Sequence, residues 1–144
     1  MSQPDAYWDS SALIPLCVPQ PQSIRAIELY KSFNVVTWWV TKVEMISGLT
    51  RLERMGQISR DQFLLGKQLA WEIEQDWVPV RSSAGIAPLA CALLEAHPLR
   101  AADALQLSAA FEACGHEPPG YVFVTADQRQ AEAARRSGFL VEFI

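Results

Sequence analysis

The chain has 144 residues, 50% of them apolar and 19% charged, which is enough to bury a core without disulfides, so we expect a single domain over residues 1–144. The same composition excludes a disordered chain. Sixteen acidic and twelve basic residues give a net charge of −4, which argues against a uniformly positive duplex-binding face but allows a nuclease with local basic patches.

The sequence shows no features of an export signal or a membrane span. Residues 1–6 carry no Lys or Arg, and Asp9 interrupts the region where an apolar signal core would lie. The longest apolar run, residues 84–94, is far short of the ~20 residues that a bilayer requires. The three cysteines are widely spaced with no C-x-x-C pair, which is typical of reduced thiols. We therefore expect a cytoplasmic protein without a membrane partner.

The first half of the chain predicts alternating strands and helices. The first expected elements are a strand at 6–9 and a helical turn from Ser10 that stops in the Pro/Gln segment 18–22. A helix capped by Ser23 then runs to about Ser32. It is followed by a strand at 35–38 and a helix that ends at Gly56. A further helix begins at Ser59, whose spacing to Gln62 matches a capping box. Its apolar residues form a stripe of Phe63, Gly66, Ala70, Ile73 and Trp77.

The second half predicts three more helices and two more strands. Helices are expected at about 84–96, where Pro88 interrupts the pattern, and at 101–114. A strand at 121–125, a helix at 128–137 and a strand at 139–144 follow. Strands separated by helices pair in parallel, so the sequence predicts an α/β fold, a three-layer α/β/α sandwich with a mostly parallel central sheet. Ligands of such folds bind beyond the carboxyl ends of the strands.

Four acidic residues fall near that carboxyl edge. Asp9 closes the first strand, Asp127 follows the strand at 121–125, and Glu44 lies about two turns into the helix after the strand at 35–38. Asp103 shares the apolar face of its own helix, where an unpaired carboxylate is costly. Each acid also has a structural interpretation. These are helix capping by Asp9 and by Asp127, the latter with Gln130 in a capping box, and ion pairs of Glu44 with Arg51 and of Asp103 with Arg100.

The four acids together favour a metal site. At one sheet edge they would repel each other unless a divalent cation neutralised them. Carboxylate oxygens without nearby His or Cys ligands select Mg²⁺ or Mn²⁺ over zinc or copper. Ions bound in this way usually work on phosphates.

Four strings of residues in order resemble the PIN-domain family and, within it, the VapC-type toxins of toxin–antitoxin pairs. The resemblance covers nearly the whole chain. The strings are Trp8-Asp-Ser-Ser-Ala-Leu13, Val43-Glu44 followed by Leu49-x-x-Leu52, Asp103-Ala-Leu-Gln-Leu107, and Val124-Thr-Ala-Asp-Gln-Arg129.

The resemblance implies a PIN-like fold and a Mg²⁺- or Mn²⁺-dependent endoribonuclease. It makes Asp9, Glu44, Asp103 and Asp127 the catalytic metal ligands, with Ser11 and Thr125 as supporting polar groups. Its implied partners are RNA and a cognate antitoxin. The chain departs from the family at Gln106, where such toxins often have a His, and after Asp127, where no further acid follows.

Positive charge and apolar surface suggest where partners bind. Arg51, Arg100 and Arg129 are the candidates for RNA contact near the acidic edge. We expect Trp71 and Trp77 in the core or at a subunit interface rather than stacked on bases. The apolar stripe at 63–77 predicts a homodimer interface or an antitoxin-binding groove.

Other functions fit the sequence less well. A haloacid-dehalogenase phosphatase needs an acid at position 11, which is Ser, and a receiver domain needs a late Lys, which is missing. A metal-independent ribonuclease needs a His pair, whereas His97 and His116 look like connection residues. The remaining alternative is a non-catalytic PIN-like module that binds RNA or protein, and such a module has no need to keep four acids together.

Overall fold

The computed structural model describes residues 2–144 and contains a five-stranded, fully parallel sheet in the order β3-β2-β1-β4-β5. The strands are β1 (Asp5–Trp8), β2 (Asn34–Trp38), β3 (Val78–Val80), β4 (Val122–Thr125) and β5 (Leu140–Phe143). The helices are α1 (Ser10–Cys17), α2 (Ser23–Ser32), α3 (Trp39–Arg54), α4 (Arg60–Asp76), α5 (Ile86–Ala96), α6 (Ala101–Ala113) and α7 (Gln128–Arg136). Within residues 2–144 none of these helices is long and apolar enough to cross a membrane.

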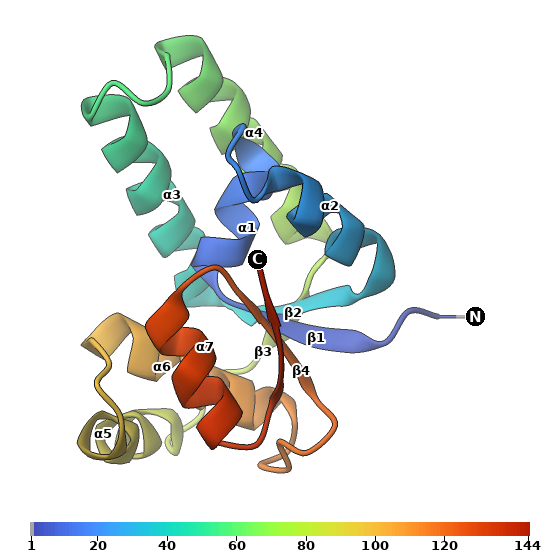
Figure 1. Cartoon of the computed structure of the whole chain (residues 1–144), viewed down its shortest axis with the longest axis vertical. Coiled ribbons are helices and arrows are strands. Elements are labelled where there is room, and N and C mark those ends of the chain that lie inside the picture. Colours follow the sequence, from blue (N-terminus) through green and yellow to red (C-terminus); the bar gives the residue numbers. More distant parts are fainter. Residues whose placement is uncertain (1) are drawn as a thin grey trace.

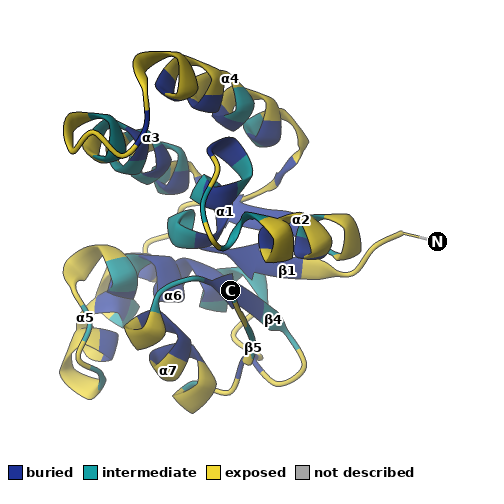
Figure 2. Cartoon of the chain, turned by 45° about the horizontal axis from the view of Figure 1, so that its top comes forward, coloured by how far each residue is buried: buried dark blue, intermediate teal, exposed yellow. Residues whose placement is uncertain are grey.

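Alternating side chains on the strands build two cores, one on each face of the sheet. Successive residues of a strand point to opposite faces. Trp8 and Val124 therefore pack with helices α1 to α4, whereas Tyr7 and Phe123 pack with α5 to α7. Figure 1 shows these helix groups on either side of the sheet, and Figure 2 shows the buried strand residues between them. The predicted three-layer α/β/α sandwich is confirmed.

The connections place a topological switch point between β1 and β4. From the central β1 the chain moves outward to β2 and β3 on one side, and it later returns to β4 and moves outward to β5 on the other. The helices that follow β1 and β4 therefore start at the same sheet edge and diverge from it. In open α/β sheets this crevice is the usual ligand site.

The sequence-based prediction missed one strand and misplaced one cap. Residues 78–80 were not expected to be a strand, because Val-Pro-Val is short and Pro79 cannot donate to the ladder; β3 accommodates it as an edge strand. Ser23 is the first residue of α2 rather than its cap, and its hydroxyl accepts a hydrogen bond from the Gln20 N–H (2.9 Å). Pro88 does not break α5, since it lies in the first turn, where helical N–H groups have no partner.

The apolar stripe of α4 packs inside the molecule, so the predicted use of this stripe as a dimer or antitoxin interface is wrong. Phe63, Ala70, Ile73 and Trp77 are all at most 9% exposed and belong to the core beneath α1 to α3. The capping box of Ser59 and Gln62 is confirmed. For Trp77 we expected a place in the core or at a subunit interface, and it lies in the core. Trp71 instead lies on the outer face of α4, with the Lys42 ammonium 3.3 Å from its ring centroid.

Gly66 allows α4 to pack closely on the end of α1, and a larger residue there should destabilise the fold. A Cβ at this position would lie 2.8 Å from Val18 Cγ1 and 3.3 Å from the Cys17 carbonyl oxygen. Overpacking of this kind costs about 1–3 kcal/mol. We expect Gly66→Val to lower the melting temperature by roughly 2–4 °C for each kcal/mol lost.

The matched control is Gln68→Val, which places the same residue on the exposed face of the same helix. Thermal unfolding followed by circular dichroism compares the two variants. Equal melting temperatures for them would contradict the close packing of α4 on α1.

Candidate active site

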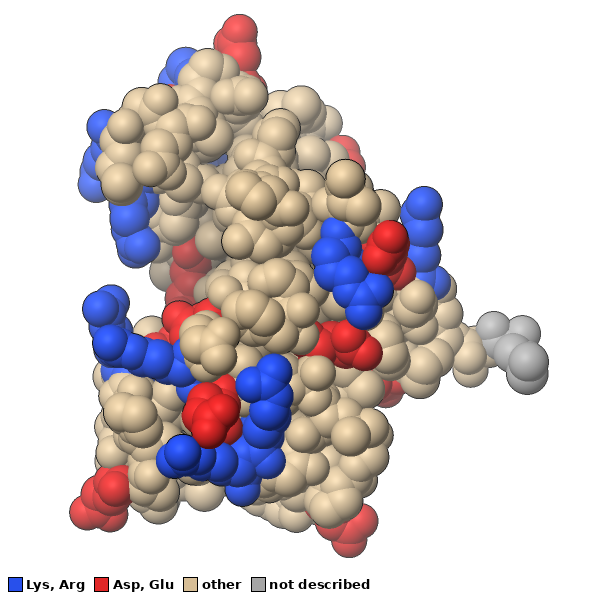
Figure 3. Space-filling model, viewed as in Figure 1, with Lys and Arg blue, Asp and Glu red and all other residues tan. Residues whose placement is uncertain are grey.

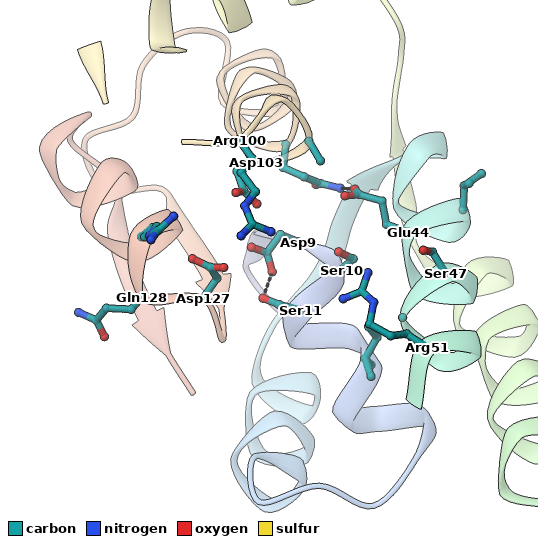
Figure 4. A pocket seen from close by; sticks show the side chains of 16 residues that line it. Asp9, Ser10, Ser11, Glu44, Ser47, Arg51, Arg100, Asp103, Asp127 and Gln128 are labelled. Carbon is teal, nitrogen blue, oxygen red and sulfur yellow. Dashed lines mark hydrogen bonds between the residues drawn. The ribbon is translucent and has the colours of Figure 1, made fainter. Parts of the chain in front are cut away.

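The four predicted acids meet at the switch point of the sheet. Asp9 follows β1, Asp127 follows β4, Glu44 lies on α3 and Asp103 lies in the first turn of α6. All four line one open cavity of about 740 Å³. Figure 4 shows their carboxylates turned toward this common space from four different elements. The sheet thus brings together residues that lie up to 118 positions apart in the sequence.

Asp9 is the most deeply buried of the acids and caps α1. Its Oδ1 accepts hydrogen bonds from the Ser11 hydroxyl (2.5 Å) and the Ala12 N–H (3.3 Å), and its Oδ2 accepts one from the Thr125 hydroxyl (2.6 Å). Burial is the main cause that raises the pKa of Asp9 to about 7, against these hydrogen bonds, and the charge of Asp127 adds to the rise. The capping interpretation is confirmed. The three hydrogen bonds do not offset the cost of burying the charge of this carboxylate.

Ser11 and Thr125 connect the end of β1 to the segment after β4. Their hydroxyl oxygens lie 3.2 Å apart. The Ser11 oxygen also accepts from the Ala126 N–H (2.9 Å), and the Thr125 oxygen accepts from the Asp127 N–H (3.0 Å). Both hydroxyls therefore donate to Asp9 while they fix the backbone that carries Asp127.

Asp127 caps α7 as predicted, but no capping box forms. Its Oδ1 accepts from the Gln130 N–H (2.9 Å). The Gln130 side chain, fully buried, instead donates from Nε2 to the backbone carbonyl of Asp103 (2.9 Å). This bond fastens the start of α7 to the first turn of α6 and so holds two of the acids at a fixed spacing.

Asp103 is half-buried and does not form the ion pair with Arg100 that the sequence allowed. The ion pairs among residues 2–144 include none between Arg100 and Asp103, so no guanidinium nitrogen of Arg100 lies within 4.0 Å of the Asp103 carboxylate. Burial raises the pKa of Asp103, and the negative charge of Asp127 adds to the rise. A hydrogen bond to the Arg100 backbone and the charges of Arg100 and Arg129 act in the opposite direction.

Glu44 also lacks the ion pair that the sequence allowed, here with Arg51. Its carboxylate instead accepts a hydrogen bond from the side-chain amide of Gln106. Burial raises the pKa of Glu44, the charge of Asp103 adds to this, and the Gln106 hydrogen bond opposes it. Neither predicted ion pair therefore forms among the described residues, although the charges of Arg100 and Arg129 still lower the pKa of Asp103.

The three arginines proposed for RNA contact all line the acidic cavity. Arg51, Arg100 and Arg129 are exposed, and none forms an ion pair with an acidic residue in the described part of the chain. Figure 4 shows the guanidinium of Arg51 turned from α3 toward the cavity and that of Arg100 lying near Asp103 and Asp9. The cavity therefore combines buried negative charge at its floor with exposed positive charge at its rim.

The donors in the cavity fit a hard divalent cation. The acids offer oxygen atoms only, and neither His nor Cys lines the cavity. The raised pKa values of Asp9, Glu44 and Asp103 arise in part from neighbouring acids, a repulsion that a bound cation would relieve. As the side chains stand, no three His, Cys, Asp or Glu residues among positions 2–144 are arranged to hold an ion.

Sequence reasoning missed the role of Gln106. We noted it only as a departure from a familiar string, yet it is 2% exposed and touches Glu44. A lone amide in the apolar stretch Ala104–Ala110 is a pattern that points to a buried polar network, because a buried amide requires partners. Its partners Tyr7 and Thr41 lie on distant elements, so only the fold reveals them.

Fold and cavity together define an α/β protein with an acidic pocket at the switch point of a parallel sheet. The sequence profile of the PIN domain matches residues 6–136. The chain therefore belongs to the PIN domain family, whose members are generally nucleases, and the resemblance described above is confirmed at that level.

Solved structures support the same fold. PAE2754 from Pyrobaculum aerophilum is 16% identical with a TM-score of 0.61, and the match covers 96% of this chain and 89% of that one. FitAcB from Neisseria gonorrhoeae is 16% identical with a TM-score of 0.60, covering 96% of each chain. No curated protein matches the chain.

Proposed function

We propose that this protein is a Mg²⁺- or Mn²⁺-dependent endoribonuclease that hydrolyses RNA phosphodiesters. The observation that carries the proposal is the convergence of Asp9, Glu44, Asp103 and Asp127 on one cavity, with no ion pair between an arginine and Glu44 or Asp103 among the described residues. Carboxylates that are expensive to bury and that a structural role does not explain are typical of functional sites. Membership of the PIN family supports the same activity.

The acids would hold the metal ion, and the remaining residues would hold the acids and the substrate. A bound divalent ion supplies a more acidic water and neutralises charge on the scissile phosphate. Ser11 and Thr125 keep Asp9 oriented through their hydroxyl groups. Arg51, Arg100 and Arg129 bind substrate phosphates at the rim. Because water is the attacking group, the expected products carry a 5′-phosphate and a 3′-hydroxyl.

We further propose that the protein is the toxin of a VapC-type toxin–antitoxin pair, with a cognate antitoxin as partner, and that it acts in the cytoplasm as a homodimer. The support is the resemblance of the four sequence strings. Since the stripe of α4 is buried, the exposed apolar residues of α3 and α4 outside the cavity, such as Trp39, Leu64 and Leu65, are the better candidates for partner contacts. Light scattering of the purified chain tests the dimer, and a monomeric mass would remove it.

The activity is tested by incubating antitoxin-free protein with tRNA, ribosomal RNA and single-stranded DNA, each with Mn²⁺ and with EDTA. We expect cleavage of at least one RNA with Mn²⁺ and none with EDTA. Cleavage that persists in EDTA would contradict the metal-dependent mechanism. Binding of RNA without cleavage under all conditions would favour the alternative, a non-catalytic PIN-like binding module.

A further inference from the structure

The acidic cavity has a neighbouring depression on each side, and the three depressions together are called the channel below. It shares Val43, Ser47 and Arg51 with a groove of about 380 Å³ along the outer side of α3, which extends to Arg54. On the opposite side it shares Gln128 and Arg129 with a hollow of about 280 Å³ beside α7, which His97, Glu132 and Arg136 also line. The three depressions are therefore direct neighbours, separated only by the side chains that they share.

Arginines stand at both ends of this channel. Arg51 and Arg54 lie on the α3 side, and Arg129 and Arg136 lie on the α7 side. Of these, only Arg136 forms an ion pair in the described chain, with the exposed Glu132. Elsewhere in the described chain Arg25, Lys42 and Arg60 each pair with an acid, whereas Lys31, Lys67 and Arg81 do not. In Figure 3 the acidic residues in the hollow lie between two groups of basic residues.

This charge pattern fits a single-stranded polyanion that crosses the acidic floor. Four acids repel phosphates, so a strand needs cations on both sides of them to stay in place. Asp9, at the floor, is only 4% exposed, which a flexible strand can reach more easily than the stiff backbone of a duplex. The α3 side alone runs over the 12 residues from Val43 to Arg54, and their 11 steps of 1.5 Å make about 16 Å of helix.

We propose that this channel binds a single strand of RNA several nucleotides long, with Arg51 and Arg54 contacting phosphates on one side of the scissile bond and Arg129 and Arg136 on the other. The proposal rests on the ribonuclease function proposed above. It predicts that affinity depends on strand length beyond the nucleotides that flank the scissile bond.

The test measures binding of fluorescent 12-nucleotide single-stranded RNA by anisotropy in EDTA, and cleavage of that RNA and of a dinucleotide in Mn²⁺. Arg54→Ala and Arg136→Ala should each weaken 12-mer binding about three- to tenfold and reduce the salt slope by about 0.7. Cleavage of the 12-mer should fall by a larger factor than cleavage of the dinucleotide. The matched controls are Arg135→Ala, next to Arg136 but outside the channel, and Lys67→Ala on α4.

Each outcome bears on one proposal. Wild-type binding by Arg54→Ala and Arg136→Ala, with 12-mer cleavage intact, overturns the channel and leaves the ribonuclease standing. Arginine-dependent binding with no cleavage of any RNA keeps the channel and overturns the ribonuclease. Equal affinity for a 12-base-pair duplex would also overturn the single-strand channel.

A separate observation concerns Gln106, whose amide links Glu44 to a buried network. Its Oε1 accepts from the Tyr7 hydroxyl (2.6 Å), and its Nε2 donates to Thr41 Oγ1 (2.9 Å) and to Glu44. Thr41 is in turn 2.7 Å from Thr37 Oγ1. Because an ionised carboxylate can only accept hydrogen bonds, Nε2 must face Glu44, and the Tyr7 hydroxyl then donates to Oε1. We infer that Gln106 is a positioning residue that holds Glu44 toward the other acids, an inference that rests on Glu44 being a metal ligand.

The test uses Gln106→Met, which keeps the size but removes the amide, and Gln106→His, which can restore an N–H donor. Titration with Mn²⁺ followed by electron paramagnetic resonance should show affinity about tenfold weaker for the Met variant and largely recovered for the His variant. The value of kcat should fall while KM for RNA stays unchanged. Thr37→Val is the control, since it removes a hydroxyl from the same network without touching Glu44.

If Gln106→Met binds Mn²⁺ as tightly as the control Thr37→Val does, the positioning role is overturned and only a structural role is left. If RNA is not cleaved by the wild type but Mn²⁺ affinity still drops in the Met variant, the positioning role stands and the ribonuclease proposal falls.

Discussion

Replacing Asp9 or Asp103 by Asn should abolish RNA cleavage while leaving the protein as stable as the wild type or more stable. Removing one group that stabilises charge in the transition state, such as an oxyanion-hole donor, typically costs about 10²–10³ in rate, and we expect at least about that loss in each variant. A residue that serves only as a helix cap or a surface charge would show no such effect. The activity loss therefore identifies these two carboxylates as catalytic.

The stability half of this prediction follows from burial and repulsion. Burial disfavours the ionised form of Asp9 and of Asp103, and the charge of Asp127 disfavours both further. An amide has no charge to desolvate. Asn is also a good N-cap, so the side chain of the Asp9→Asn variant can still accept from the Ala12 N–H. Cleavage assays and thermal unfolding, both with Asp76→Asn as an exposed control, give the answer; a large drop in melting temperature for both variants would mean that the carboxylates are structural.

The same shift predicts how stability depends on pH in EDTA. The pKa of Asp9 rises from 3.8 to about 7 on folding, so between these values the folded protein binds more protons than the unfolded chain. The contribution of protonated Asp9 to the free energy of unfolding is therefore fully present below about pH 4 and is lost as the pH rises to about 7. The advantage of Asp9→Asn over the wild type should be largest at pH 8 and vanish near pH 4. Melting temperatures of both proteins across this range measure it, and a constant difference would contradict the raised pKa.

Much of the fold could be predicted because local patterns and sheet topology agree. The strand at 121–125 and the capping box at Ser59 rest on short-range chemistry, and both occur close to where they were expected. The strand Val78–Val80 could not be predicted, since a three-residue edge strand that contains Pro is defined by its neighbour β2 and not by its own sequence. The stripe of α4 was correct as a pattern, but periodicity does not reveal whether the partner belongs to the same chain.

In the candidate site, too, some residues could be placed from the sequence and others could not. Asp9 and Asp127 follow strands directly, so the rule for carboxyl ends of parallel strands places them. Glu44 and Asp103 sit on helices, and only the packing of α3 and α6 shows that they face the same cavity. Contacts of side chains with backbone, such as Gln130 with the carbonyl of Asp103, depend on atomic positions that no sequence pattern encodes. The acids are thus predictable, whereas the groups that orient them are not.

Divalent metal ions should stabilise the wild-type protein through these same acids. A ligand that binds only the folded state at 100 times its Kd adds about 2.7 kcal/mol to the free energy of unfolding. For a chain of 144 residues this corresponds to a rise of roughly 5–10 °C in melting temperature on addition of saturating Mn²⁺. Because the ion relieves repulsion among Asp9, Glu44 and Asp103, the rise should be larger at pH 8 than at pH 5, where protons compete with it.

Differential scanning fluorimetry with Mn²⁺, with Mg²⁺ and with NaCl at matched ionic strength measures this effect without RNA. NaCl should give no comparable rise, Asp76→Asn should behave as the wild type, and Asp9→Asn and Asp103→Asn should lose most of the gain. The same rise in all variants would place the metal elsewhere on the surface. Because this result depends only on the geometry of the acids, it separates a metal site that lacks activity from a cavity that binds no metal.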